Sequence, residues 1–305
     1  MADRPQPHGW LILDKPRGLG STQAVGAVKR NLREAGYGKV KVGHGGTLDP
    51  LAEGVLPIAL GEATKLAGRM LDASKIYDFT IAFGEETDTL DTEGEVVGTS
   101  DHRPSEVEIA AILPRFTGLI EQVPPAYSAL KVDGRRAYDL ARNGVEVALA
   151  TRSVTIHALD ILRTDSDTAT LRAHVSKGTY IRSLARDIAR ALGAVGHVTY
   201  LRRAKAGPFG EDRAISLDML NEIGKGARLQ DHLLPLEAGL DDIPALALDP
   251  TSAQAARQGR ELSGLPQADG LHFAKLGDVP IALMDVQGGT AKVVRGFNLP
   301  TDVAE

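Results

Sequence analysis

Apolar and polar side chains alternate along several stretches of this chain, a pattern typical of strands with one buried face. The segment 77–83 carries apolar or aromatic residues at every second position, and 169–176 alternates in a similar way. An apolar run at 10–13 and a mostly apolar stretch at 154–162 are also short enough to be strands. The pattern therefore predicts strands at intervals over more than half of the chain.

Two stretches carry apolar residues at the three- and four-residue spacing of an amphipathic helix. In the first, Ser21 or Thr22 is the predicted N-cap, and the helix continues to about Glu34. In the second, 179–192, the apolar positions form one stripe. Arginines four residues apart occupy its other face: Arg182, Arg186 and Arg190.

Grouped strands with intervening helices, without a regular βαβ repeat, favour an α+β fold built on a mixed or antiparallel sheet. Residues 205–245 contain several glycines and a run of acidic residues, which is typical of a passage between domains. We therefore expect a large domain over 1–240 and a small β-rich domain over 241–305. In the small domain a short helix at 252–258 precedes strands predicted at 271–276, 280–285 and 292–295.

The composition, with 43% hydrophobic and 25% charged residues, is that of an ordinary globular protein. No apolar run is long enough to span a bilayer, and residues 1–8 lack the apolar core of a signal peptide. We therefore expect a cytoplasmic protein with no membrane partner.

Metal and nucleotide cofactors are not expected. The chain has no cysteine, and its eight histidines never occur at helical ligand spacing. No glycine-rich phosphate loop follows a predicted strand. The segment 88–94 resembles a calcium-binding loop, but Ser100 takes the place of the last carboxylate ligand, so a solvated hairpin is the better interpretation.

The formal net charge of -5 argues weakly against a nucleic-acid partner. The basic residues are grouped, however, and a basic face can bind phosphate in a protein that is acidic overall. For any single group, a solvated helix surface is the alternative. The groups are Lys29, Arg30 and Arg33; Lys39 and Lys41; Arg135, Arg136 and Arg142; Arg182, Arg186 and Arg190; and Arg202, Arg203 and Lys205.

The segment 43–57 is the part of the chain most suggestive of a site, and its pattern is too broken to predict a helix or a strand. Its glycines allow a large ligand to come close to the main chain. Pro50 fixes its own φ and disfavours helical geometry at Asp49, so that carboxylate is held at a bend. A preorganised carboxylate is typical of a catalytic or metal-binding site, and a structural turn is the alternative. Asp49 with Glu53 is also compatible with a glycosidase acid and nucleophile.

This segment resembles the catalytic motif of the TruB family of tRNA pseudouridine synthases, and further motifs follow in family order. Residues 9–22 resemble the first motif, with its Lys-Pro-x-Gly-x-x-Ser core. Residues 124–138 are similar to the RNA-gripping insertion, and 176–184 with 200–203 to the remaining active-site motifs. The resemblance covers roughly residues 9–210. One departure is Gly45, where the family commonly has Thr.

The resemblance implies a pseudouridine synthase catalytic domain in which Asp49 is the catalytic residue and Arg182 lies beside it. It further implies that Tyr77 and Tyr180 are the two pocket tyrosines and that Leu201 closes the pocket as an apolar wall. Tyr77 would offer a stacking face near C5 of the base, and acting as a base would require its activation.

The resemblance also implies a set of RNA contacts. His44 would stack within the T-loop of tRNA, the insertion at about 124–150 would grip the RNA, and 241–305 would be a PUA-like RNA-binding domain. Candidate contacts to the RNA backbone are Lys15, Lys131, Arg135, Arg136 and Arg142. The implied partner is the T-arm stem-loop of tRNA, bound by a monomer without a guide RNA.

The implied reaction isomerises a uridine at position 55 of tRNA to pseudouridine. The N1–C1′ bond breaks, the uracil turns, and C5 joins C1′, so neither a redox cofactor nor a group donor is needed. The uridine has to be flipped out of its loop before a side chain can reach it. Attack of Asp49 at C1′, its addition to C6 and removal of a ribose proton are all compatible with one carboxylate.

Two other functions remain open. The chain could be an RNA-guided relative of the dyskerin-like branch, although the insertion and the segment 87–95 are similar to the stand-alone branch. It could also be an RNA-folding module whose effect requires no catalysis, although the set of Asp49, Tyr77, Tyr180 and Arg182 argues for an enzyme.

Overall fold

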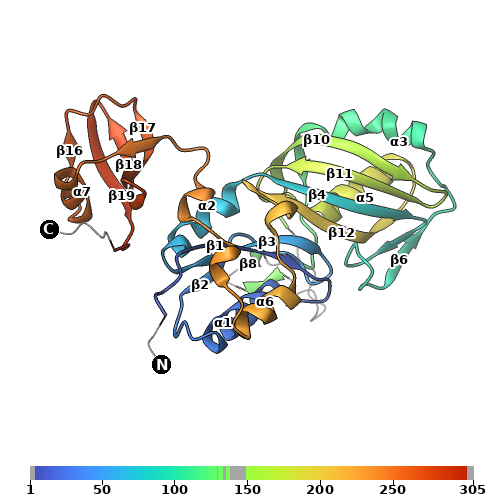
Figure 1. Ribbon diagram of the computed structural model, residues 1–305. Helices are drawn as coiled ribbons and strands as arrows, with labels where there is room; N and C mark the ends of the chain where they lie inside the picture. The colour runs from blue at the N-terminus through green and yellow to red at the C-terminus, as the bar shows by residue number, and fades with distance from the viewer. Residues whose placement is uncertain (1–3, 129, 133–134, 138–148, 301–305) are drawn as a thin grey trace.

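The computed structural model describes residues 4–128, 130–132, 135–137 and 149–300. A sheet of ten strands forms the larger part of the protein (Figure 1). Its main path runs β14 (Leu233–Leu234), β1 (Gly9–Lys15), β3 (Glu53–Leu60), β12 (Gly196–Ala206), β4 (Lys75–Phe83), β11 (Thr168–Val175), β10 (Arg152–Thr164) and β7 (Gly118–Gln122). Two short strands lie off this path, β2 (Val42–His44) beside β3 and β13 (Phe209–Gly210) beside β12.

The large sheet is mixed, because β3 and β12 run parallel whereas the other neighbouring strands are antiparallel. This confirms the predicted α+β fold, and strands occur at each of the four segments predicted from alternation or from a short apolar run. Gly54 permits the close approach of β3 to β12. Its φ of +100° is one that other residues rarely adopt, and a Cβ there would lie 2.4 Å from the carbonyl oxygen of Arg203.

The prediction that 43–57 forms neither helix nor strand is wrong at both ends. Gly43 and His44 belong to β2, and β3 begins at Glu53. From Gly54 onward β3 is buried, so its apolar residues are continuous instead of alternating. The loop that remains, residues 45–52, carries Asp49.

Helices α1 (Ser21–Glu34) and α6 (Leu217–Gly224) pack on the β1–β3 half of the sheet, and α5 (Ile181–Ala191) packs on β4 and β12. The two predicted helices are thus present, but the predicted N-cap is wrong. Gly20 is the N-cap, and its N–H donates to Gln23 Oε1 at 2.8 Å. Ser21 is instead the first helical residue, and its hydroxyl bonds the main chain of Leu48.

The smaller elements are two short helices and two strand pairs. They are α2 (Ala67–Asp72), α3 (Glu106–Ile112), β5 (Glu85–Thr87) with β6 (Val96–Thr99), and β8 (Lys131–Val132) with β9 (Arg135–Arg136).

A five-stranded sheet follows, and Figure 1 shows it at one end of the molecule, nearest to α2. Its order is β15 (Ala245–Ala247), β17 (Gly270–Leu276), β18 (Val279–Gln287), β19 (Thr290–Gly296) and β16 (Leu262–Ser263), with α7 (Pro250–Arg257) packed on it. The predicted helix and strands of the small domain are therefore present. Trp10 and Phe209 of the large sheet share one hydrophobic cluster with Phe273 of the small sheet and with Phe297, which directly follows β19.

The division at residue 240 stays a prediction. Within the ranges that the structure describes, no helix is both long and apolar enough to cross a membrane.

Candidate active site

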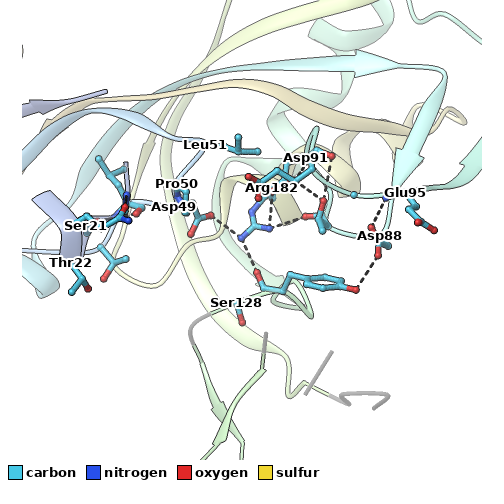
Figure 2. Close-up of a pocket in the computed structure, with 18 residues that line it drawn as sticks. Ser21, Thr22, Asp49, Pro50, Leu51, Asp88, Asp91, Glu95, Ser128 and Arg182 are labelled. Atoms are coloured by element: carbon cyan, nitrogen blue, oxygen red, sulfur yellow. Dashed lines mark hydrogen bonds and ion pairs between the residues drawn. The ribbon is translucent and has the colours of Figure 1, made fainter. Parts of the chain in front are cut away.

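The loop between β2 and β3 holds the carboxylate of Asp49 at the wall of a cavity of about 800 Å³ (Figure 2). The loop is tied at its entrance by the N–H of Gly45, which donates to the carbonyl of Pro57 at 2.8 Å. Further on, the carbonyl of Pro50 accepts from the N–H of Gly18 at 2.7 Å. The side chain of Asp49 is 44% exposed, so it is both fixed at its base and open to a ligand.

Arg182, at the start of α5, is the partner of Asp49. Its Nη2 donates to Asp49 Oδ2 at 2.8 Å. The side chain of Arg182 is only 8% exposed. Sequence spacing placed Arg182 on a face with Arg186 and Arg190, and its burial against the loop comes from the packing of α5. A charge-assisted hydrogen bond of this length orients the carboxylate toward the cavity.

Three more hydrogen bonds fix the guanidinium of Arg182, which Figure 2 labels. Nη1 donates to Asp91 Oδ2 at 3.1 Å and to the carbonyl of Thr89 at 2.8 Å. Nη2 donates to the carbonyl of Tyr127 at 3.0 Å. With Asp49 as the fourth acceptor, all four hydrogens of the two terminal nitrogens are used, so the guanidinium has one defined orientation.

Asp91 is the second carboxylate partner of Arg182, and the sequence analysis missed it. Its side chain is 10% exposed, and it also accepts from Thr89 Oγ1 at 2.6 Å and from the N–H of Glu93 at 3.0 Å. The segment around it forms the predicted hairpin of β5 and β6. One feature of the sequence could have indicated a second partner. A guanidinium has five N–H donors, so an arginine buried beside Asp49 requires further acceptors.

The five residues expected around the reacting base lie together. A smaller cavity of about 100 Å³ is lined by Asp49, Arg182, Tyr77, Tyr180 and Leu201. Burial raises the pKa of the Tyr180 phenol, so this side chain is neutral near pH 7. Gln122 fixes the main chain of Tyr180 on both sides, accepting from its N–H at 2.8 Å and donating to its carbonyl at 3.1 Å.

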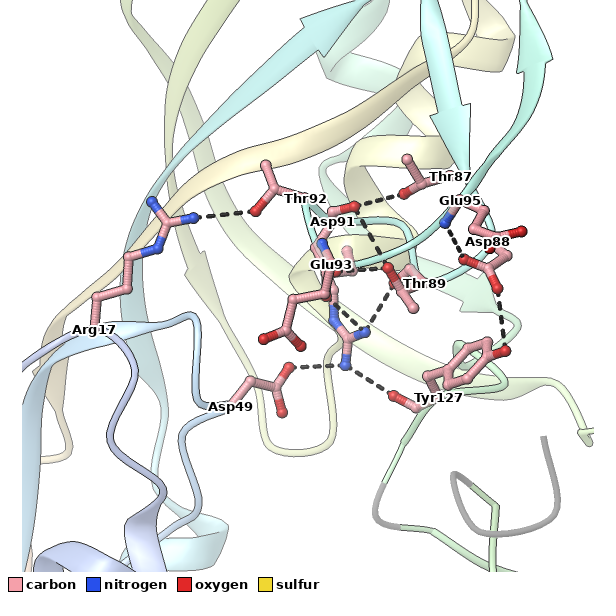
Figure 3. Close-up of polar contacts among 11 residues, drawn as sticks. Arg17, Asp49, Thr87, Asp88, Thr89, Asp91, Thr92, Glu93, Glu95 and Tyr127 are labelled. Carbon is pink, nitrogen blue, oxygen red and sulfur yellow. Dashed lines mark hydrogen bonds and ion pairs between the residues drawn. The ribbon is translucent and has the colours of Figure 1, made fainter. Parts of the chain in front are cut away.

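A further contact near Asp49 and Arg182 joins the segment after β1 to the β5–β6 hairpin. Nη2 of Arg17, in the turn after β1, donates to the hydroxyl of Thr92 in the β5–β6 hairpin at 3.0 Å (Figure 3). Glu53, by contrast, lies 3.3 Å from Arg202 and faces another cavity, next to Asp14 and Lys15. Asp49 and Glu53 therefore do not flank one site, and the glycosidase hypothesis is wrong.

His44 lies at the end of β2, outside the two cavities that Asp49 and Arg182 share with the tyrosines and the hairpin. Burial and, secondarily, the charge of Arg203 lower the pKa of its imidazole. A neutral ring is suited to stacking on a base. Its Nδ1 is buried and has no hydrogen-bond partner within the described part of the chain.

Lys15 is wrong as a candidate contact to the RNA backbone, because the residue is completely buried. Its Nζ donates to the carbonyls of Leu19 at 2.7 Å, Pro16 at 3.0 Å and Pro50 at 3.4 Å. Burial lowers its pKa to about 8. Among the other candidates, Lys131, Arg135 and Arg136 lie on strands β8 and β9, and Arg142 lies outside the described residues.

Several of the basic groups expected to bind phosphate are paired within the protein. Arg186 bonds Asp187, Arg190 bonds Glu86, and Arg202 bonds Asp14, Glu53 and Glu211. Arg203 is 1% exposed. Burial removes Arg203 from any phosphate-binding face, whereas for the three paired arginines that face stays a prediction. Sequence spacing does not show which carboxylates the fold brings near.

Known proteins resemble this chain over nearly its whole length. The family model of the TruB family pseudouridylate synthase (N-terminal domain) matches residues 32–181, and that of the tRNA pseudouridylate synthase B C-terminal domain matches 182–241. A protein of Novosphingobium aromaticivorans named tRNA pseudouridine synthase B is 68% identical over 305 residues, covering 97% of this chain and 99% of that protein. One of the same name from Zymomonas mobilis is 58% identical over 291 residues, covering 95% and 96%.

Among solved structures, a chain in an H/ACA RNP bound to a substrate RNA containing 2′-deoxyuridine is similar in fold. Its TM-score is 0.73 at 25% identity, covering 97% of this chain and 86% of that chain. A similar chain occurs in an archaeal box H/ACA sRNP Nop10–Cbf5 complex, with a TM-score of 0.71 at 25% identity, covering 97% and 87%.

The fold, with a carboxylate–guanidinium pair beside two tyrosines, and these matches define a pseudouridylate synthase, which is an isomerase. Within that class of enzymes the chain belongs to the TruB family. The resemblance stated from its motifs is therefore confirmed.

Gly45 lies so close to Met70 of α2 that a side chain at this position would overlap it. A Cβ at Gly45 would lie 2.6 Å from Met70 Cβ and 3.0 Å from Met70 Cγ, in the buried contact between the loop and α2. Gly43, two residues earlier, has nothing within 4 Å of such an atom.

We therefore expect Gly45→Ala to lower the free energy of unfolding by about 1–3 kcal/mol, because the overpacked loop or α2 has to shift. Urea unfolding measures the loss. Gly43→Ala is the matched control and should change the free energy by less than about 1 kcal/mol. Equal losses in the two variants would contradict the steric explanation.

The Asp91–Arg182 pair predicts a second stability effect. Asp91→Asn removes one charge of a buried pair, so we expect the free energy of unfolding to fall by about 3–5 kcal/mol. Asp187→Asn breaks the more exposed pair with Arg186 and should cost about 0–1 kcal/mol. Urea unfolding of both variants at one salt concentration tests the difference, and similar losses would show that the Asp91 pair is not specially stabilising.

Proposed function

We propose that this enzyme converts the uridine at position 55 in the T-loop of tRNA to pseudouridine, with Asp49 as the essential catalytic residue. The observation that carries the proposal is the carboxylate of Asp49, held 2.8 Å from Arg182 at a small cavity lined by two tyrosines. The tRNA substrate is supported by the relatives that cover nearly the whole chain, which are named tRNA pseudouridine synthase B.

The proposed chemistry requires few groups. The N1–C1′ bond of a flipped-out uridine breaks, the uracil turns in the pocket, C5 bonds to C1′, and the C5 proton is lost while N1 gains one. Asp49 acts beside the ribose, and Arg182 orients it. Tyr77 and Tyr180 would stack on the base, and Leu201 would close the pocket. The neutral phenol of Tyr180 suits stacking better than proton abstraction.

The proposed partner is the T-arm stem-loop of tRNA. His44, with its lowered pKa, would stack among the bases of the T-loop as a neutral ring. The insertion at about 124–150, with Lys131, Arg135, Arg136 and Arg142, would grip the RNA backbone. The small sheet, in the region 241–305, would be a PUA-like RNA-binding domain.

We further propose that the enzyme acts as a cytoplasmic monomer without a guide RNA. The similar solved chains belong to H/ACA complexes but are 25% identical to this chain, whereas the 68% identical relative is named as a tRNA pseudouridine synthase. This difference in identity favours the stand-alone branch.

The test is release of tritium from C5-labelled uridine in a T-arm stem-loop, without guide RNA or metal. Wild-type protein should release tritium, because C5 loses its proton when it bonds to C1′. Asp49→Asn keeps the size of the side chain but removes its charge, and we expect the release rate to fall by at least about 10⁴-fold, below detection.

Binding of the same RNA to both proteins, measured by filter retention, is the control and should be similar. No release by wild-type protein despite tight binding would favour a guided subunit or an RNA-folding module. Release by Asp49→Asn at the wild-type rate would remove Asp49 from the chemistry.

A further inference from the structure

We propose that Ser21 and Arg203 are positioning residues for Asp49: both are buried, and both hold the main chain of its loop so that the carboxylate meets Arg182. The inference rests on the proposed catalytic role of Asp49. Neither side chain lies within hydrogen-bond distance of Asp49, so each acts through the loop backbone.

Ser21 fixes the residue that precedes Asp49. Its hydroxyl donates to the carbonyl of Leu48 at 2.9 Å and accepts from the N–H of Leu48 at 2.8 Å. Ser21 and Leu48 are 4% and 3% exposed, so water does not compete for these bonds. A single hydroxyl on the first turn of α1 therefore holds both the N–H and the C=O of Leu48, the residue before Asp49. Figure 2 shows Ser21 beside Asp49.

Arg203 joins the two sides of the same loop. From β12, its Nε donates to the carbonyl of Val55 at 2.7 Å, its Nη2 to Gly46 at 3.1 Å and its Nη1 to Thr47 at 3.4 Å. Gly46 and Thr47 precede Asp49, and Val55 follows it. The planar guanidinium thus fixes the distance between the two ends of the loop, the segment at Gly46 and Thr47 and the start of β3.

The burial of Arg203 requires an explanation that packing alone does not give. The residue is 1% exposed, and within the described ranges no carboxylate forms an ion pair with it. A buried charge with only carbonyl partners is expensive unless those bonds are well made. All three of its acceptors belong to the loop or to the start of β3, so the charge stabilises the geometry of this one segment.

The consequence for Asp49 follows from its short side chain. With two rotatable bonds, the position of the carboxylate depends mainly on where the backbone places its Cα. A displacement of about 1 Å in a catalytic group can reduce a rate by about 100-fold. Loosening the loop should therefore slow the chemical step more than it weakens the binding of RNA, which contacts a much larger surface.

The experiment measures the single-turnover rate of tritium release with enzyme in excess over the T-arm stem-loop, together with RNA affinity and the melting temperature. The variants are Ser21→Ala, which deletes both hydroxyl bonds, and Arg203→Lys, which keeps the charge but loses the fork. Thr80→Val is the matched control, because it removes a buried hydroxyl that bonds Thr170 at 2.9 Å in the sheet. Asp49→Asn and wild type are measured in parallel.

We expect Ser21→Ala and Arg203→Lys to release tritium about 10- to 100-fold more slowly while their Kd for the RNA stays within about 3-fold of wild type. Thr80→Val should melt at a lower temperature yet react at the wild-type rate. If Arg203→Lys does not fold, Ser21→Ala decides the question.

A folded Ser21→Ala protein with the wild-type rate would overturn the proposal, as would an equal rate loss in Thr80→Val. Failure of the proposed function gives a different result, because wild type would then release no tritium or Asp49→Asn would release it normally.

Discussion

A buried guanidinium between two carboxylates is the interaction around which the site of this enzyme is organised. Arg182 uses all four hydrogens of its terminal nitrogens, and the acceptors come from the loop before β3, the β5–β6 hairpin and the segment after β7. Because the side chain of Arg182 is only 8% exposed, its guanidinium loses most of its hydration, and the four acceptors offset that loss. Segments that are distant in sequence are therefore held together by the requirements of one side chain.

The parallel pairing of β3 with β12 gives this site its second constraint. It places Arg203 opposite Gly54, directly beside the loop that carries Asp49. Two other buried groups act on the same loop, since Lys15 donates to the carbonyl of Pro50 and Ser21 binds both polar groups of Leu48. The loop is thus held by hydrogen bonds at several points although it lacks regular secondary structure, and its one carboxylate, that of Asp49, lies at the wall of the cavity.

Local patterns predicted much of this architecture. Alternation found β4 and β11, helical spacing found α1 and α5, and the small domain was predicted as short strands separated by glycine turns. The same patterns were wrong at β3, since a strand buried on both faces does not alternate. They were also wrong for the N-cap of α1. A serine at the start of a helix can bond a backbone group distant in sequence instead of capping its own helix, and Ser21 bonds Leu48. Asp91 was missed because a hairpin aspartate has no local feature that distinguishes a solvated turn from a ligand of a buried arginine.

The sequence by itself determined the α+β class, the family and the residues that line the small cavity, since these depend on spacing and on motifs in a fixed order. Which charges are free was decided only by the tertiary structure. Lys15 and Arg203 carry the charge that a phosphate contact requires, yet the fold buries both, and each donates to carbonyls of the loop that carries Asp49. The physical reason is that burial and hydrogen-bond partners depend on how segments distant in sequence pack together. The local sequence around a lysine or arginine therefore does not show whether its side chain will be exposed.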